Sequence, residues 1–281
     1  MSCVYRPKSL RPPWDSVKVA SLAGCGEHEH CHEGDGDEER GFDAADGDQE
    51  EHEHSLLGLG LAGHPGDDLG AGCVNVSGRE LSDAEINELW DAWTPGAAAQ
   101  WLSKVAAPWY VAAGWALELF TDHAAREHAD LEIGVPAARF DEIVTAFPGF
   151  KWDVAGDGRV WPFPEQSSEH FQTWLREPAT GRYRIDVFRE PHIGDRWVCR
   201  RDASITLPHN ELIRRTSDGI PYATPEVALL FKAKHLREKD EADFQRVLPR
   251  MNQTQRSRLI SWLSQIHPGH PWIKALAIHT S

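Results

Sequence analysis

The sequence predicts an α+β fold, in which a small mixed β-sheet with flanking helices is followed by a mostly helical C-terminal domain. Three observations support this prediction. Residues 109–135 have the pattern of an apolar strand, a glycine turn, a short helix and a second strand. Residues 150–205 have the composition and alternation of β-strands. From Pro225 onward the spacing of apolar residues becomes helical.

Composition divides the chain into three parts, at residues 1–78, 79–205 and 206–281. The first part is an acidic tail rich in His and Gly, with five Lys or Arg against sixteen Asp or Glu. Such a segment buries too little apolar surface to offset chain entropy, so we expect it to be disordered. Its closely spaced His and Cys residues could bind Zn2+, Ni2+ or Cu2+. The alternatives are a solvated acidic tail and an extension from an upstream start codon.

Several helix signals stand in the middle part of the chain. Ser82 and Glu85 have the spacing of a capping box and begin an amphipathic helix. Thr94, followed by proline, begins a second helix with threonine as its N-cap. Residues 139–147 predict a third helix, which Pro148 ends. These helices flank the strands of the predicted sheet.

Two strands are predicted late in the β-rich stretch, at residues 170–177 and 182–189, around a Pro-Ala-Thr-Gly turn. The C-terminal part begins its helices at Pro225. We expect the first of them to run as far as Val247, and a further helix to span residues 253–266.

An acidic pair stands on the second strand of residues 109–135. Asp130 and Glu132 are two residues apart, so on a strand they share one face. Two neighbouring carboxylates repel each other unless a cation lies between them, and Mg2+ prefers such oxygen ligands together with substrate phosphates. The alternative is the solvated face of an edge strand.

The turn upstream of this pair is built from small residues. Val111 ends a strand, and Gly114 opens a helix two alanines later. Small residues let backbone N–H groups approach a phosphate, and a helix N-terminus favours negative charge. A phosphate-approach turn followed by two carboxylates is the minimum equipment for metal-assisted phosphoryl or nucleotidyl transfer.

The same segment resembles the signature of the polymerase-β-like nucleotidyltransferases, and specifically of the aminoglycoside 2''-adenylyltransferase-like family. The family pattern is a glycine pair, W-A-L-D-L-F, and then a strand R-x-H-x-D-L-E-I. Residues 114–120 and 126–133 match it, with fifteen residues between Gly114 and Asp130. The resemblance covers residues 81–272, and further stretches that look like the family are Trp197, 200–202, 218–222, 225–234, 237–244 and 270–272.

The resemblance implies transfer of a nucleoside monophosphate from ATP by a two-metal mechanism with Mg2+. Three carboxylates would form the metal site. Asp130 and Glu132 would hold the metal that bridges the triphosphate. Asp186, on the polar face of a neighbouring strand, would help to bind a second Mg2+ and accept the proton of the acceptor hydroxyl. Its rivals, Asp153 and Asp195, stand in turn-like or less strand-like sequence.

The turn and the strand carry further candidates. Ala113 and Gly114 are the expected phosphate-binding turn, and Ala113 stands where the family has its first glycine. The added methyl group crowds the approach of the nucleotide phosphates. His128 shares the face of Asp130 and Glu132, so it could orient a carboxylate or bind metal weakly, although most such histidines do neither.

Basic residues are the candidates for neutralising the triphosphate. Lys232 or Lys234 could do so, although lysines on helices are usually just solvated. Arg126 could contact a phosphate or form an ion pair with Glu127 or Asp130. The sequence leaves these alternatives open.

Charge and composition narrow the partners. The net charge is −15 and no basic stripe is present, so nucleic acid is not expected as a partner. The resemblance therefore points to a small hydroxylated acceptor that receives AMP; aminoglycosides are the family's best-known acceptors. Trp152, Trp161 and Trp174 lie in the stretch expected to flank that acceptor. The competing hypothesis is a non-catalytic nucleotide-binding relic, or a metal buffer acting through the tail.

Membrane attachment and secretion are not expected. No apolar run approaches the ~20 residues of a membrane helix. The apolar run before Cys25 is interrupted by Asp15 and Lys18, and it falls short of a signal-peptide core. The five cysteines include no C-x-x-C pair, which suits a reducing cytoplasm.

Overall fold

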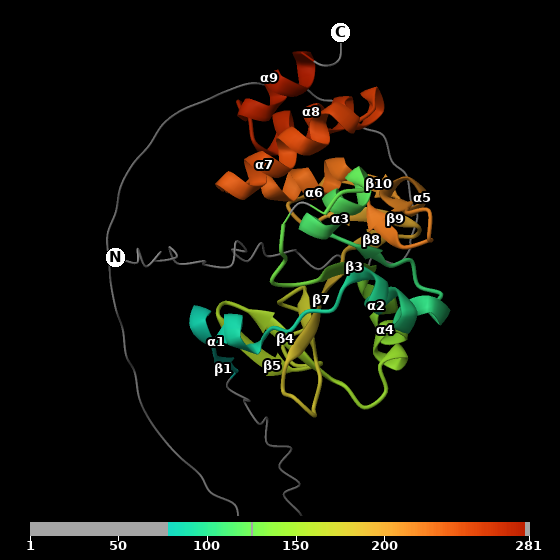
Figure 1. The fold of residues 1–281 in the computed structure, drawn as a ribbon, viewed down its shortest axis with the longest axis vertical. Helices are drawn as coiled ribbons and strands as arrows, with labels where there is room; N and C mark the ends of the chain where they lie inside the picture. The colour runs from blue at the N-terminus through green and yellow to red at the C-terminus, as the bar shows by residue number, and fades with distance from the viewer. Residues whose placement is uncertain (1–77, 125, 279–281) are drawn as a thin grey trace, which may run out of the picture. The chain divides into compact units, whose positions relative to one another are not determined.

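The computed structural model describes residues 78–124 and 126–278, which belong to one compact unit (Figure 1). The predicted tail and its metal-binding alternative lie outside the described residues, except for Gly78. The helices are α1 (Asp83–Leu89), α2 (Pro95–Trp101), α3 (Ala113–Thr121), α4 (Phe140–Ala146), α5 (His209–Leu212), α6 (Pro225–Lys232), α7 (Glu238–Val247), α8 (Gln253–Ile266) and α9 (Pro271–Ile278). The strands are β1 (Arg79–Glu80), β2 (Tyr110–Val111), β3 (Glu132–Pro136), β4 (Lys151–Gly156), β5 (Arg159–Pro162), β6 (Gln172–Arg176), β7 (Tyr183–Glu190), β8 (His192–Ile193), β9 (Arg196–Cys199), β10 (Asp202–Pro208), β11 (Ile213–Arg215) and β12 (Pro221–Ala223).

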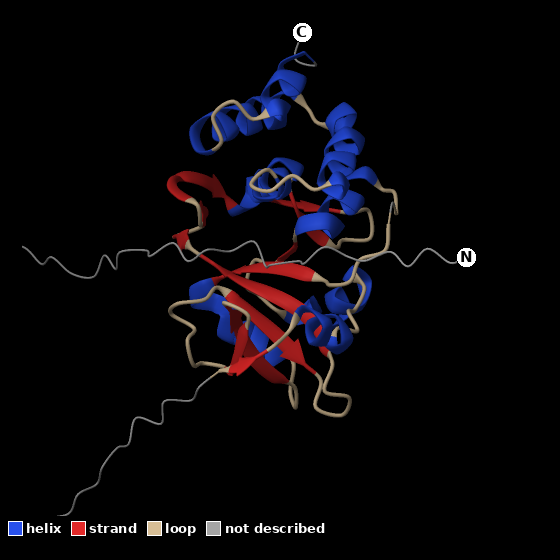
Figure 2. Ribbon diagram, turned by 90° about the vertical axis from the view of Figure 1, so that its left-hand side faces the viewer, coloured by secondary structure: helices blue, strands red, loops and turns tan. Residues whose placement is uncertain are grey.

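A nine-stranded mixed sheet forms the centre of the described fold, in the order β1-β5-β4-β6-β7-β3-β2-β12-β11. β3 pairs with β7 and β2 with β12 in parallel, while the other neighbours are antiparallel. A second sheet of three strands has the order β10-β9-β8. Figure 2 shows the C-terminal helices gathered to one side of the strands. The predicted α+β class, with a mixed sheet and a mostly helical C-terminal part, is confirmed.

The helix signals read from the sequence are confirmed by the observed caps. The Ser82 hydroxyl accepts from the backbone N–H of Glu85, whose side chain accepts from the backbone N–H of Ser82. At α2 the Thr94 hydroxyl accepts from the backbone N–H of Ala97, and proline follows at the first helical position. The third helix, α4, begins after a short 3-10 turn at 137–139. These caps satisfy N–H groups that a helix start otherwise leaves without partners.

The first C-terminal helix is shorter than predicted, because α6 ends at Lys232 and α7 begins at Glu238. The physical reason is the contact between Lys232 and Asp240, which one continuous helix would prevent. Lys232 Nζ lies 2.8 Å from Asp240 Oδ1, whereas eight residues of helix would separate them by ~12 Å along the axis. The turn between α6 and α7 brings the lysine back onto the buried aspartate.

The C-terminal part also contributes to the sheet. β12 pairs with β2 and β11 pairs with β12, so residues 213–223 extend the nine-stranded sheet before any long C-terminal helix begins. The boundary predicted between residues 205 and 206 falls within β10, and the run of helices starts only at Pro225. Strands β11 and β12, which lie in the predicted C-terminal part, therefore belong to the same nine-stranded sheet as the strands of the middle part.

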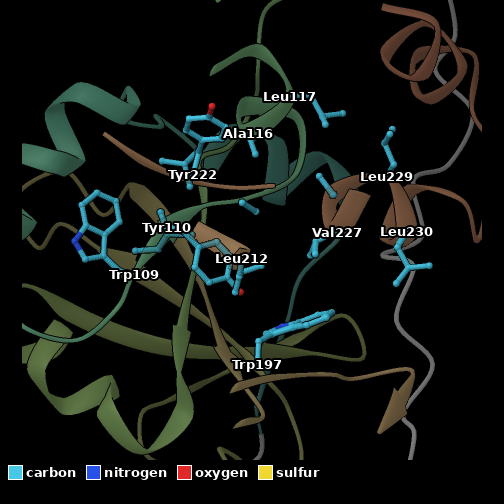
Figure 3. Close-up of a cluster of buried hydrophobic side chains, with 14 of the residues drawn as sticks. Trp109, Tyr110, Ala116, Leu117, Trp197, Leu212, Tyr222, Val227, Leu229 and Leu230 are labelled. Carbon is cyan, nitrogen blue, oxygen red and sulfur yellow. The ribbon is translucent and has the colours of Figure 1, made fainter. Parts of the chain in front are cut away.

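The main core lies between the sheet and the helices, as Figure 3 shows for one cluster. Leu117 of α3 and Leu229 of α6 are fully buried there, together with Tyr110 of β2 and Trp197 of β9. This burial fixes α3 and α6 against the strands. The free thiol of Cys199 is buried in the same core. Within the described ranges, no helix has the length and apolar character to cross a membrane.

We expect Leu117→Ala to lower the free energy of unfolding by about 2–5 kcal/mol, because a fully buried side chain is replaced by a cavity. The matched control is Leu236→Ala, since Leu236 is 43% exposed and its loss should change stability by less than about 0.5 kcal/mol. Urea unfolding of the two variants measures the difference. Equal costs would show that α3 does not pack as described.

Candidate active site

Two carboxylates from distant parts of the chain meet on adjacent strands. The parallel pairing of β3 and β7 places Glu132 opposite Asp186, and the antiparallel pairing of β6 and β7 places Trp174 opposite Asp186. Directly paired residues on neighbouring strands share one face of the sheet. Asp186 therefore stands on a strand, as expected, with Glu132 on one side and Trp174 on the other.

Asp130 lies just before the strand on which it was predicted. β3 begins at Glu132, and the Asp130 carbonyl accepts a hydrogen bond from Trp115 Nε1 at 3.1 Å. The Leu131 carbonyl accepts from the Asp186 backbone N–H at 2.8 Å, which holds this approach to the strand against β7. The prediction that both acids lie on the strand is therefore wrong for Asp130. Its charge nevertheless acts on both other acids.

Burial raises the pKa of Glu132 to about 8, and the charges of Asp130 and Asp186 add to the rise. Lys232 and Arg200 oppose it without cancelling it. A carboxyl group that is taken out of water beside two others favours its neutral form unless a cation is supplied. The neighbourhood of Glu132 is therefore short of positive charge.

Burial likewise raises the pKa of Asp186 to about 7, and Asp130 adds to the rise. A hydrogen bond from Gln172 Nε2 to Asp186 Oδ2, 2.7 Å long, opposes it. The other oxygen, Oδ1, is buried and meets no donor in hydrogen-bond geometry. A buried oxygen with no donor is costly, and a bound cation would satisfy it.

The carboxylate oxygens suit a hard divalent cation. Among residues 78–124 and 126–278, no three His, Cys, Asp or Glu side chains are arranged as a ready-made metal cluster. Mg2+ does not require one, since it is usually held by one or two carboxylates together with substrate phosphates and water. The pair of Glu132 and Asp186, with the buried Oδ1, fits that mode of binding.

The phosphate-approach turn has an unusual backbone. Ala113, the first residue of α3, has φ +46°, in the left-handed region that favours glycine. Gly114 is required for a different reason. A Cβ at this position would lie 2.4 Å from Arg126 Nη2 and 2.7 Å from His128 Cε1. The glycine therefore lets both side chains close over the start of α3.

His128 is oriented by an acid that the sequence reading missed. Its Nε2 lies 2.9 Å from Glu118 Oε1, with both side chains almost fully buried. Its ring stacks on Trp115 at 4.4 Å, and burial lowers its pKa. The predicted partners of His128 were the acids on the strand, and this contact is with α3 instead. The signal for Glu118 was its place on the apolar side of a short helix.

Arg126 has a different ion-pair partner from those considered. Its Nη2 lies 3.8 Å from Asp243 Oδ2 of α7, and its Nη1 donates to the Glu127 carbonyl at 3.1 Å. The predicted ion pair with the carboxylate of Glu127 or Asp130 is therefore replaced by a contact with the helical part. Because Arg126 also lies close to Gly114, it links the turn at the start of α3 to α7.

The charges of the two candidate lysines act on different groups. Lys232 Nζ lies 2.8 Å from Asp240 Oδ1 and 3.1 Å from Asp243 Oδ2, and its charge reaches Glu132. Lys234 follows the end of α6, and together with burial and Arg201 it lowers the pKa of His267. The structure therefore brings the charge of Lys232 toward Glu132.

Arg200 is a further site residue without an assigned role in the sequence reading. Its Nε lies 3.2 Å from Glu190 Oε2, and its guanidinium lies over the Phe188 ring at 4.4 Å. It lowers the pKa of Glu132 and of Asp186, against the effect of their burial. Only its place in an Arg-Arg-Asp motif marked it in the sequence.

Of the two alternative aspartates, Asp153 is bound by other side chains and Asp195 lies in a turn. Asp153 lies on β4, in contrast to the less strand-like setting expected, and Arg176 Nε lies 2.6 Å from its Oδ2. The Tyr183 hydroxyl donates to the same oxygen at 3.0 Å. Asp195 lies in the turn between β8 and β9, as expected. The structure thus leaves Asp186 as the aspartate beside Glu132.

Comparison with known proteins finds similar solved structures. No protein-family model and no curated protein matches the chain. A lincosamide antibiotic adenylyltransferase bound to lincomycin is 19% identical, with 54% of this chain and 92% of that chain covered and a TM-score of 0.40. The antibiotic-resistance factor ANT(2'')-Ia with adenylyl-2''-tobramycin is 11% identical, with 61% and 94% covered and a TM-score of 0.40. A nucleotidyltransferase-like protein from Paracoccidioides brasiliensis is 15% identical, with 70% and 94% covered and a TM-score of 0.35.

We expect Ala113→Gly to raise the free energy of unfolding by about 0.5–1 kcal/mol, because glycine adopts positive φ without the steric cost of a Cβ. The matched control is Ala112→Gly, at φ −113°, which should lower stability by a similar amount. Thermal unfolding of both variants measures the effects. A loss of stability in both would show that the turn is not left-handed at Ala113.

Without divalent metal, we expect Glu132→Gln to become increasingly stabilising as the pH rises from 5 to 8.5. The folded wild type keeps a proton on Glu132 up to about pH 8, whereas the unfolded chain releases it near ~4.3. Wild-type stability therefore falls across this interval, and the variant avoids a loss of roughly 2–4 kcal/mol.

Urea unfolding in a metal chelator at pH 5 and pH 8.5 measures this difference. Glu88→Gln, at an exposed position, is the control and should show no such trend. A constant difference between wild type and Glu132→Gln at the two pH values would contradict the raised pKa.

Proposed function

We propose that the protein transfers a nucleoside monophosphate, AMP from ATP, to a hydroxyl group of a small molecule in a reaction that requires Mg2+. The observation that carries this proposal is the cross-strand pair of Glu132 and Asp186, with Asp130 beside it. Nucleotidyl transfer needs carboxylates that hold the metal ion of the triphosphate, and this pair could supply them together with phosphate oxygens and water.

Asp130 and Glu132 are the residues that would hold one Mg2+ together with triphosphate oxygens, and Asp186 would contribute to a second ion. When bound, Mg2+ supplies charge stabilisation at the reacting phosphorus. The acceptor oxygen forms a bond to the α-phosphorus while the bond to pyrophosphate breaks. Asp186 would accept the hydroxyl proton, as a carboxylate within hydrogen-bond reach can.

The triphosphate would lie near the start of α3, where Ala113 is partly exposed and the Arg126 and His128 side chains lie over the buried Gly114. Arg126 approaches Gly114 closely enough to contact a phosphate there. Lys232 adds positive charge from α6 and already acts on Glu132. Lys234 is a weaker candidate, since its charge acts toward His267.

The acceptor is proposed to be a small hydroxylated molecule, of which an aminoglycoside is one class. Its support is the net charge of −15, which disfavours a nucleic-acid acceptor. The positive φ of Ala113 supports a second candidate function, in which the protein binds nucleotide without catalysing transfer. In that case the extra Cβ would block the phosphate from its reactive position.

We expect wild-type protein to release pyrophosphate from Mg2+-ATP only in the presence of a hydroxylated acceptor, and Asp130→Asn to lose this release. The exposed Asp157→Asn is the matched control and should keep it. A panel that includes aminoglycosides and other polyols identifies the acceptor class. Nucleotide binding without release from any acceptor would favour the non-catalytic candidate. Failure to bind ATP would contradict both.

A further inference from the structure

Gln172, the first residue of β6, makes a direct contact with Asp186 that the proposed reaction does not yet explain. Its Nε2 donates to Asp186 Oδ2 at 2.7 Å. Asp186 is only 4% exposed, and its Oδ1 meets no donor in hydrogen-bond geometry. Gln172 therefore holds one oxygen of this carboxylate.

The sheet register delivers the amide from a fixed direction. Gln172 is paired with Phe188, two residues beyond Asp186 on β7, so it approaches the carboxylate diagonally on the same face. Trp174 occupies the directly opposite position on β6, and Glu132 the position on β3. Glu132, Trp174 and Gln172 thus surround Asp186. The Gln172 amide donates to Oδ2 at 2.7 Å, and a smaller hydrogen-bonding effect of the Trp174 side chain also lowers the Asp186 pKa.

The segment that leads into Gln172 is itself held in place by Arg189. Its guanidinium donates to the Ser167 carbonyl at 2.6 Å and to Thr173 Oγ1 at 2.8 Å. Arg189 is 7% exposed and also lies over the rings of Phe140 and Phe163, each at 5.9 Å. A buried cation with several partners restricts its surroundings. The start of β6 is therefore a rigid support for the Gln172 side chain.

A neutral amide and a charged partner have different effects on a carboxylate. Asp153 on β4 is an example of a carboxylate with a charged partner. Asp153 is directly opposite Trp174 and is held by Arg176 at 2.6 Å and by the Tyr183 hydroxyl at 3.0 Å. A guanidinium neutralises the carboxylate that it orients. An amide orients the group but leaves its negative charge available for a metal ion or a proton.

We propose that Gln172 is a positioning residue, which fixes Asp186 Oδ2 and so orients the carboxylate whose Oδ1 receives the acceptor hydroxyl proton. The inference rests on the proposed function for the reaction, but the orienting contact does not depend on turnover. In the step, the acceptor oxygen bonds to the α-phosphorus, the bond to pyrophosphate breaks, and the hydroxyl proton moves to Oδ1 of Asp186.

The test compares Gln172→Met, which keeps the length but removes the donor, with Gln172→Asn, which keeps the amide but shortens its reach. Gln100→Met, at an exposed position on α2, is the matched control. The first readout is the 13Cγ NMR signal of Asp186, which is assigned by its loss in Asp186→Asn. The second is the rate of acceptor-dependent pyrophosphate release.

We expect the Asp186 signal to move in both Gln172 variants and to stay in place in Gln100→Met. We also expect kcat to fall by about 10- to 100-fold with KM for ATP unchanged, as for partners that orient a functional group at a metal site. Thermal unfolding shows whether each variant folds. If Gln172→Met does not fold, Gln172→Asn carries the test.

An unmoved Asp186 signal in a folded Gln172 variant would overturn the inference, whether or not the wild type turns over. A moved signal with unchanged kcat in an active enzyme would also overturn it. A rise in KM for the acceptor alone would assign Gln172 to acceptor binding instead. If the wild type is inactive, the proposed function fails, while the NMR comparison still decides whether Gln172 orients Asp186.

Discussion

The repulsion between the carboxylates of Glu132, which is partly buried, and Asp186, which is buried, is the constraint on which the rest of the site depends. Glu132 and Asp186 stand opposite each other on parallel strands, and the charge of Asp130 acts on both. In a medium of low polarity, such groups are stable only when they hold protons or face cations. This requirement accounts for the positive charge that Lys232 directs at Glu132 and that Arg200 directs at both acids.

The helical part supplies much of that positive charge through buried ion pairs. The turn after α6 returns Lys232 to Asp240 and Asp243, and Asp243 also faces Arg126 from the loop after α3. Taking such groups out of water costs free energy, which their mutual attraction offsets only when the geometry is good. The network therefore contributes less to stability than to the placing of cations beside the carboxylates.

The turn at the start of α3 shows how the surrounding fold can impose a backbone conformation on an unfavourable residue. Ala113 adopts positive φ although a glycine would do so at lower cost. β2 and α3 are both packed in the main core, so the chain between them has few other paths. Strain of this kind persists only where the neighbouring structure determines the conformation. The close approach at Gly114, by contrast, is a requirement for space.

Local patterns in the sequence determined much of this protein. The caps at Ser82 and Thr94, the strands on both sides of the 178–181 turn and the α+β class depend on neighbouring residues, and the structure confirms them. Tertiary structure decided the register that pairs Glu132 with Asp186, the contact of Lys232 with Asp240 and the contact of Gln172 with Asp186. The register of a sheet and the end of a helix depend on burial and charge between segments far apart in the chain, which no local pattern contains.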